Sequence, residues 1–234
     1  MYTIKDIVDS LPEEKKRADG LWSKVLRPLA LPFTWLALRM RLKANAVSYL
    51  SVVFSISGGV LFSMPGFWAP LWGAVLFNVF SILDCVDGNI ARTTKTANPW
   101  GNWADAVTGF IAYIAVFTAS GMYVFLRTGW WWVLLITSLT SSANLLTRAA
   151  FQFYKNIVGT KEARGSVSFE QKLADTVGVT GFMMPLLVIF HCIGALTRGG
   201  GGVFGMSAII AFNAAFYGGG CLLTLIKLAR KSNA

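Results

Sequence analysis

Charged residues and cysteines are scarce in this sequence, and histidine occurs once. Only 14% of the 234 residues are charged, whereas 55% are apolar, and the mean hydropathy is +0.56. This composition excludes an ordinary soluble domain and indicates an integral membrane protein with one domain. The three cysteines are odd in number and unpaired in spacing, which excludes a disulfide framework. The first forty residues lack the apolar core of a signal peptide, so we expect no cleavage.

Long apolar runs predict an all-α integral membrane protein with six transmembrane helices preceded by an amphipathic interfacial helix. A span needs about 20 mostly apolar residues. The candidate spans are 46–64, 68–90, 102–126, 129–153, 174–196 and 203–226. The expected units are an N-terminal arm (1–20), the interfacial helix (21–45), a six-helix domain (46–228) and a tail (229–234). Residues 21–42 could form a seventh span, but two prolines and arginines toward both ends favour a helix in the membrane interface.

Basic residues predict the orientation of these spans. Of the 21 Lys and Arg residues, 19 lie before the first span, after the last one or in the loops on that same side, and only Arg127 and Arg198 lie in the alternate loops. By the positive-inside rule, both termini and the 92–101 loop are expected to be cytoplasmic, in a cytoplasmic or inner membrane. The same rule, together with attraction to anionic headgroups, accounts for the net charge of +10, so no nucleic acid partner is expected.

The stretch DCVDGNIARTTKTANPWGNWADAVTG (84–109) holds three of the 11 acidic residues between apolar runs. A charge inside a bilayer is costly, so acids there are functional candidates by default. On one predicted helix, Asp84 and Asp87 share a stripe with Gly88, Ala91 and Arg92 because their spacing is i, i+3, i+4, i+7 and i+8. On the next, Gly101, Asp105 and Gly109 follow at i, i+4 and i+8. If the loop between them brings the two stripes face to face, three carboxylates converge.

Converging carboxylates need a partner that neutralises them, either protons or a cation. Oxygen ligands suit Mg²⁺ and Mn²⁺ better than zinc, which prefers the histidine and thiolate that the facing stripes lack. The small residues on the stripes leave room for a bulky ligand, and Arg92 offers a forked donor for phosphate. Together these features favour a nucleotide diphosphate with a divalent ion. The acids could instead extend to the interface or pair with Arg92 and Lys95, but this does not explain three of them on facing stripes.

These residues resemble a known signature. The pattern D-x2-D-G-x2-A-R-x8-G-x3-D, from Asp84 to Asp105, is similar to that of the CDP-alcohol phosphotransferase (CDP-alcohol phosphatidyltransferase) family, in which a further x3-D follows. The segment KANAVSYLS (43–51) resembles the family's PN-x-[VI]-[ST] opening of the first span, with Ala44 in place of proline. The six-span plan and the preceding amphipathic helix also match the family, so the resemblance covers nearly the whole chain.

The resemblance implies a homodimeric membrane transferase of phospholipid biosynthesis. Such proteins move a phosphoalcohol, here a phosphatidyl group, from a CDP-alcohol such as CDP-diacylglycerol to a hydroxyl acceptor, and release CMP with Mg²⁺ or Mn²⁺ as cofactor. Its partners would be a CDP-linked lipid or alcohol, the acceptor and membrane lipids. The implied metal ligands are Asp84, Asp87 and Asp105, with Asp105 also catalytic. The implied nucleotide- and phosphate-binding residues are Asp84, Gly88, Ala91, Arg92, Gly101 and Asn45.

The sequence departs from the signature at its last position, where Gly109 stands in place of the fourth aspartate, the expected general base. A base commonly contributes about 10²- to 10⁴-fold to the rate. Three explanations are open: an acceptor that carries its own anionic group, a substitute among the later acids, or a catalytically silent protein that only binds a CDP-alcohol. The later acids are Glu162, Glu170 and Asp175. Thr108 points about 100° away on a helix and is a poor substitute.

Two arginines are candidates for the acceptor. Arg148 near the end of the fourth predicted span and Arg164 in the following loop could receive an anionic acceptor, although a solvent-facing role explains either. The single histidine, His191, lies far from the predicted site and has no predicted role. A transporter with a cation site would place acids near the midplane of two related halves. The acids lie toward one face and no internal repeat is present, which argues against this class.

Overall fold

The computed structural model describes residues 2–11, 21–158, 179–197 and 200–232. Every regular element in these ranges is a helix, as the apolar runs predict. The elements are α1 (Ile4–Asp9), α3 (Leu21–Arg39), α4 (Ala44–Phe62), α5 (Trp68–Thr93), α6 (Pro99–Thr128), α7 (Trp132–Val158), η1 (Val179–Met183, a π-helical turn), α10 (Met184–Leu196) and α11 (Gly200–Ser232).

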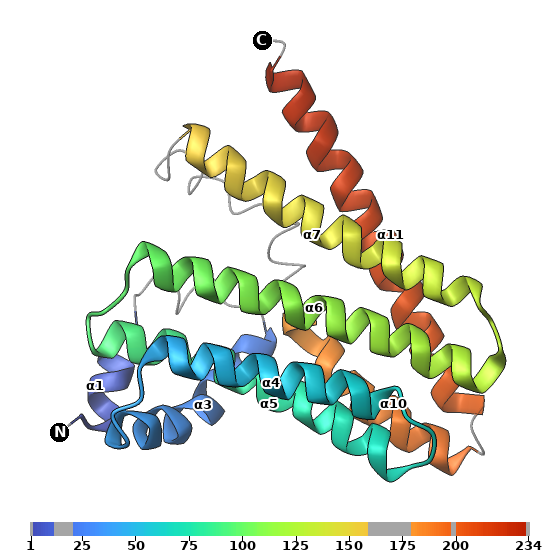
Figure 1. Ribbon diagram of the computed structural model, residues 1–234, viewed down its shortest axis with the longest axis horizontal. Coiled ribbons are helices and arrows are strands. Elements are labelled where there is room, and N and C mark those ends of the chain that lie inside the picture. Colours follow the sequence, from blue (N-terminus) through green and yellow to red (C-terminus); the bar gives the residue numbers. More distant parts are fainter. Residues whose placement is uncertain (1, 12–20, 159–178, 198–199, 233–234) are drawn as a thin grey trace.

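Helices α4, α5 and α6 run side by side along the long axis and form the centre of the molecule (Figure 1). Glycines let α4 and α5 approach closely. A Cβ atom on Gly73 would overlap the backbone nitrogen of Phe62 and lie 2.7 Å from the carbonyl oxygen of Gly58. Because backbone cannot move aside as a flexible side chain does, this contact fixes how far α4 can slide along α5.

Helix α6 is defined by local signals at both of its ends. Asn98 caps its N-terminus by accepting a hydrogen bond from the backbone N–H of Gly101 (2.9 Å), and Pro99 occupies the first turn. Gly129 ends the helix in the left-handed conformation, with a φ of 74°. The helix is therefore longer at both ends than the predicted span 102–126.

Four helices are long and apolar enough to cross a membrane: α4, α5, α6 and α11 up to Lys227. They coincide with the predicted spans 46–64, 68–90, 102–126 and 203–226. The run 129–153 forms most of α7, a long helix that is not among these four. The described part of the run 174–196 forms η1 and the 13-residue helix α10. The count of six spans therefore stays a prediction, whereas the all-α membrane class is confirmed.

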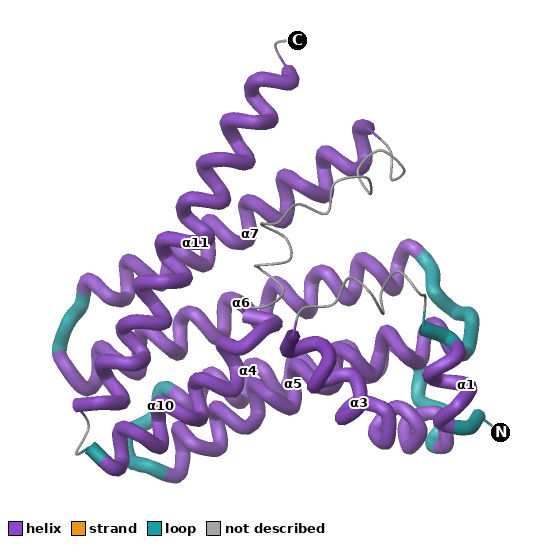
Figure 2. Tube along the Cα trace, turned by 180° about the vertical axis from the view of Figure 1, so that it is seen from behind, coloured by secondary structure: helices purple, strands orange, loops and turns teal. Residues whose placement is uncertain are grey.

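The arm and the predicted interfacial helix lie together at one end of the molecule, where Figure 2 shows α1 and α3 beside α5. Helix α3 continues through Pro28 and Pro32. Its position in a membrane interface stays a prediction. The N-terminal arm is not merely a solvated segment, because α1 packs on α3 and α5 and buries the Ile7 side chain completely.

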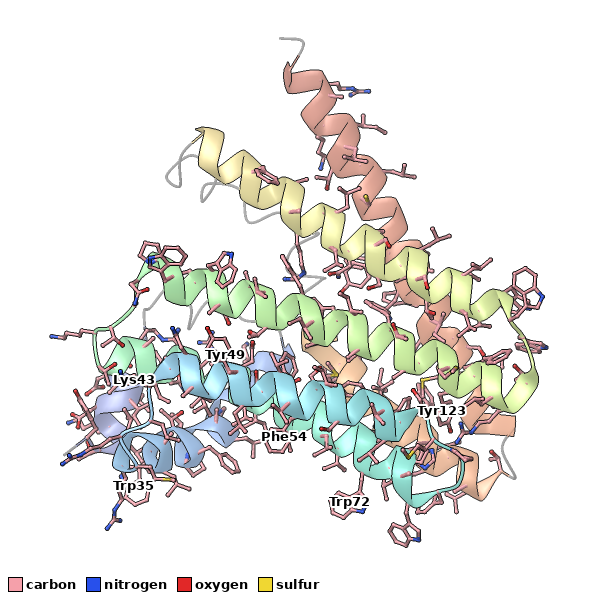
Figure 3. The ribbon with its side chains drawn as sticks, in the orientation of Figure 1. Trp35, Lys43, Tyr49, Phe54, Trp72 and Tyr123 are labelled. Carbon is pink, nitrogen blue, oxygen red and sulfur yellow. The ribbon has the colours of Figure 1, made fainter. Side chains whose placement is uncertain are left out.

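A polar contact joins three segments at the opposite end. His191 of α10 donates from Nε2 to the carbonyl oxygen of Phe67 (2.8 Å), between α4 and α5, and its Nδ1 accepts from the Tyr123 hydroxyl of α6 (3.0 Å). Donation to a carbonyl fixes this tautomer. Figure 3 shows Tyr123 at the far end from Lys43, which precedes α4. His191 therefore fixes helices in place far from the predicted site, and no role had been predicted for it.

Candidate functional site

The stripe predicted on α5 forms near the end of that helix. Asp84 and Asp87 both lie in α5, within three turns of its C-terminus at Thr93. The Asp87 side chain is only 4% exposed, and the hydroxyl of Ser48 on α4 donates to its Oδ2 at 2.5 Å. A buried carboxylate needs such a donor, because burial without one is costly. The spacing on α5 was thus sufficient to predict the stripe, but not the partner that holds Asp87.

Helix α6 brings the second stripe to the same place. A Cβ on Gly101 would lie 3.6 Å from the side-chain oxygen of Asn45, so the first turns of α4 and α6 are neighbours. Asp105 is exposed and interacts electrostatically with Asp87 and with Arg92. Helix α4 packs against both α5 and α6, so the two stripes lie at the same end of these three helices.

The donor atoms at this site are carboxylate oxygens, the ligand type that Mg²⁺ and Mn²⁺ prefer. These carboxylates do not form a complete metal site by themselves, because among the described residues no three His, Cys, Asp or Glu side chains lie close enough to hold one ion. Mg²⁺ keeps several water ligands and binds through one or two carboxylates plus phosphate oxygens. One or two of the carboxylates of Asp84, Asp87 and Asp105 would therefore fit such an ion bound together with a phosphate ligand.

Arg92 folds back over its own helix. A Cβ on Gly88 would lie 3.1 and 3.2 Å from the two terminal nitrogens of the guanidinium, so the glycine leaves the space that the arginine occupies. One of these nitrogens, NH2, donates to Asn89 Oδ1 at 2.8 Å. The buried Nε has no partner among the described residues. Arg92 consequently holds unused donor capacity beside the carboxylates, as a phosphate-binding arginine requires.

Arg148 reaches this region from α7. Its Nε donates to Asn144 Oδ1 (3.1 Å), and its guanidinium carbon lies 4.3 Å from the centre of the Tyr113 ring on α6. Tyr113 follows Gly109 by one turn. Among the described residues, the one atom that a Cβ on Gly109 would meet within 4 Å is Tyr113 Cε2, at 3.9 Å. The structure therefore places Arg148 next to the stripe that carries Gly109. Residue 109 also has room for a side chain.

Several predicted candidates are placed elsewhere or are not described. Arg164 and the three later acids lie outside the described residues. Thr108 is buried and donates to the backbone oxygen of Asp105 at 2.9 Å, which confirms that it is a poor substitute for a base. The Ser48 contact was missed although Ser48 lies in the quoted segment KANAVSYLS, where the serine of the family pattern was the available signal.

A polar pocket opens at the end of α5 beside Arg92. It has a volume of about 580 Å³, and its walls come from α1 and from the end of α5 with the turn that follows. The lining residues are Tyr2, Asp6, Ser10, Arg92, Thr93 and Lys95. The Ser10 and Thr93 hydroxyls lie 3.2 Å apart and join the two walls. Solvent and small polar solutes can thus reach the Arg92 end of the site past α1.

Carboxylates, an arginine and small residues thus gather at one end of a set of apolar helices long enough to cross a membrane. The comparison with known families makes this specific. The chain belongs to the CDP-alcohol phosphatidyltransferase family, whose model matches residues 41–216.

Two relatives carry the same descriptive name. The sequence is 28% identical over 102 residues to the phosphatidylinositol phosphate synthase of Streptomyces avermitilis, a match that covers 44% of this chain and 39% of that protein. It is 29% identical over 103 residues to the phosphatidylinositol phosphate synthase of Cutibacterium acnes, covering 44% of this chain and 46% of that protein. The chain thus matches less than half the length of these curated relatives.

Proposed function

We propose that the protein is a metal-dependent transferase that moves a phosphatidyl group from CDP-diacylglycerol, or a related CDP-alcohol, to a hydroxyl acceptor. Family membership supports this class of reaction. The observation that carries the proposal is that Asp87 and Arg92 on α5 interact electrostatically with Asp105 on α6, at the end where the first turns of α4 and α6 are neighbours.

The bond changes follow from the substrates. The acceptor hydroxyl oxygen forms a bond to the phosphorus that carries the alcohol. The bond from this phosphorus to the oxygen shared with the CMP phosphate breaks, and CMP leaves with the electron pair. Arg92 binds a phosphate oxygen of the donor, and Asn45 together with the small residues lines the nucleotide. Asp84, Asp87 and Asp105 would hold Mg²⁺ or Mn²⁺, and the chemistry that such an ion would supply is neutralisation of phosphate charge.

The glycine at position 109 restricts which acceptors can react, because the acceptor hydroxyl must lose its proton. With no carboxylate at position 109, the hydroxyl proton must pass to another group. An acceptor that carries its own phosphate supplies one, and Arg148 beside Tyr113 offers a cation to bind it. The name of both relatives, phosphatidylinositol phosphate synthase, supports an acceptor of this kind. Asp105 remains the catalytic carboxylate in this proposal, and a homodimer with its site facing the cytoplasm is expected.

Release of CMP tests the proposal. Purified protein in nanodiscs would be given CDP-diacylglycerol, Mn²⁺ and, one at a time, inositol phosphate, glycerol phosphate, inositol and serine. We expect CMP release only with metal and with a phosphate-bearing acceptor, and its loss in Asp87→Asn. Asp9→Asn is the matched control, because Asp9 is exposed on α1. Release with inositol or serine but not with the phosphate-bearing compounds would contradict the assigned acceptor class.

A catalytically silent protein that binds CDP-alcohols is the second candidate, favoured by Gly109 alone. It would bind CDP in a metal-dependent manner without releasing CMP. Gly109→Asp separates the two, because a side chain fits at this position in the structure. CMP release by Gly109→Asp but not by the native protein would identify the silent protein. Release by the native protein would show that the fourth aspartate is dispensable.

A further inference from the structure

A buried threonine of α3 contacts the signature helix. Thr34 is 0% exposed, and its hydroxyl donates to the carbonyl oxygen of Ala30 at 2.8 Å. The Thr34 hydroxyl oxygen in turn accepts a hydrogen bond from Asn89 Nδ2 on α5 at 3.1 Å. Asn89 is 3% exposed. The contact joins two polar groups inside an otherwise apolar interface of Ala30, Ala37, Val86 and Ile90, where an unmatched polar group would be costly.

This contact decides which way the Asn89 amide faces. The Thr34 hydroxyl donates its single proton to the Ala30 carbonyl oxygen on α3, so toward Asn89 it can act only as an acceptor. The amide nitrogen must therefore face Thr34, and the amide oxygen faces Arg92. That oxygen accepts from Arg92 NH2 at 2.8 Å. A reversed amide would place its NH₂ group against the guanidinium, where two donors meet. The bond from Thr34 to the α3 backbone thus sets the direction of the next two hydrogen bonds: Asn89 donates to Thr34, and Arg92 donates to Asn89.

The orientation of the Arg92 guanidinium depends on its hydrogen bond to Asn89 Oδ1. Its guanidinium lies over Gly88, where there is no side chain to confine it, and its buried Nε has no partner among the described residues. The charges of Asp87 and Asp105 attract it toward the metal-binding side, while Arg27 of α3 repels it. Electrostatic attraction is not directional, so it does not by itself orient the planar fork. The hydrogen bond that Arg92 NH2 donates to Asn89 Oδ1 does so.

We propose that Thr34 is a positioning residue: through Asn89 it fixes the orientation of the Arg92 guanidinium, and α3 thereby completes the phosphate site. The identity of the phosphate rests on the proposed function, whereas the positioning itself does not. The two positions between Gly88 and Ala91, which the signature leaves unspecified, thereby have different roles: Asn89 orients Arg92, and Ile90 packs in the α3 interface.

Two matched variants test the positioning. Thr34→Val removes the hydroxyl at nearly constant volume, and Thr34→Ser keeps it. CDP binding with Mn²⁺ in nanodiscs would be measured by calorimetry. We expect Thr34→Val to weaken binding about three- to tenfold, as loss of one hydrogen bond in a charged network predicts, and Thr34→Ser to remain within about twofold. In an Arg92→Gln background, Thr34→Val should have no further effect, because the residue through which it acts is gone.

A second measurement needs no nucleotide. Phenylglyoxal modifies arginine side chains, and peptide mass spectrometry gives the rate at Arg92 in each variant, with Arg127 at the other end of α6 as internal reference. We expect the Arg92 rate to rise several-fold in Thr34→Val and to stay at the native value in Thr34→Ser. An unchanged Arg92 rate in Thr34→Val overturns the proposal, whatever the CDP affinity. If the native protein binds no CDP, the proposed function fails, and the modification rates still decide the role of Thr34.

Discussion

Removal of the Ser48 hydroxyl should weaken metal binding far more than its size suggests. Ser48 is 3% exposed and Asp87 is 4% exposed, and the hydroxyl donates directly to the carboxylate. A hydrogen bond to a charged group contributes about 1.5–3 kcal/mol. Residues that orient a metal ligand typically change metal affinity by about 10- to 100-fold when they are replaced. We therefore expect Ser48→Ala to raise the dissociation constant for Mn²⁺ by about 10- to 100-fold.

The assay is an electron paramagnetic resonance titration of free Mn²⁺ in the presence of CDP, supported by the Mn²⁺ dependence of CMP release. Ser55→Ala is the matched control. Ser55 lies on the same helix and is equally buried, but its hydroxyl has no partner among the described residues, so its loss should leave both affinity and stability nearly unchanged. Ser48→Thr keeps the hydroxyl and should lie between the native protein and Ser48→Ala.

Two results would refute this reasoning. Equal Mn²⁺ affinity in Ser48→Ala and the native protein would show that the Ser48 contact does not orient a metal ligand. Equal losses in Ser48→Ala and Ser55→Ala would show that the effect comes from packing in α4, not from the hydrogen bond to Asp87. A thermal unfolding curve for each variant separates affinity from stability.

Two further substitutions probe the helix contact and the acceptor side. Gly73→Ala should lower the stability in thermal unfolding by about 1–3 kcal/mol, because its Cβ would overlap the Phe62 backbone. Gly219→Ala is the control and should be neutral or stabilising, because a Cβ there meets no described residue within 4 Å. Arg148→Gln should raise the KM for a phosphate-bearing acceptor at least tenfold and leave CDP affinity unchanged, whereas an equal loss of CDP affinity would place Arg148 on the donor side. Arg148→Lys should recover only part of the loss, because lysine lacks the planar group that stacks on Tyr113.

Local spacing was enough to predict the parts of the site that lie on single helices. The stripe from Asp84 to Arg92 follows from helical geometry alone, and the course of α6 follows from a cap at Asn98 and a glycine at position 129. The short loop between the two helices added the expectation that their stripes face each other, and Asp87 and Asp105 interact electrostatically.

The contacts between helices could not be predicted in this way. Ser48 meets Asp87, and Thr34 meets Asn89, only because α4 and α3 pack on α5 at one particular register. That register depends on backbone contacts such as Gly58 with Gly73, which no periodicity in the sequence specifies. The packing of the arm was not predicted for a related reason: a short polar helix gives little apolar signal, and the burial of Ile7 exists only against α3 and α5.

The length of α6 determines where in the bilayer the chemistry would take place. Its 30 residues extend about 45 Å, which exceeds a hydrocarbon layer of about 30 Å and equals the bilayer with its headgroups. Exposed tryptophans mark both ends, Trp100 and Trp103 at one and Trp132 beyond the other. Asp105 lies just past Trp103, so with these tryptophans in the interface its carboxylate would be at the depth of the lipid phosphates. A lipid-linked donor would therefore arrive by lateral diffusion within its own leaflet, a soluble acceptor would arrive from the water, and neither would cross the hydrocarbon to meet the other.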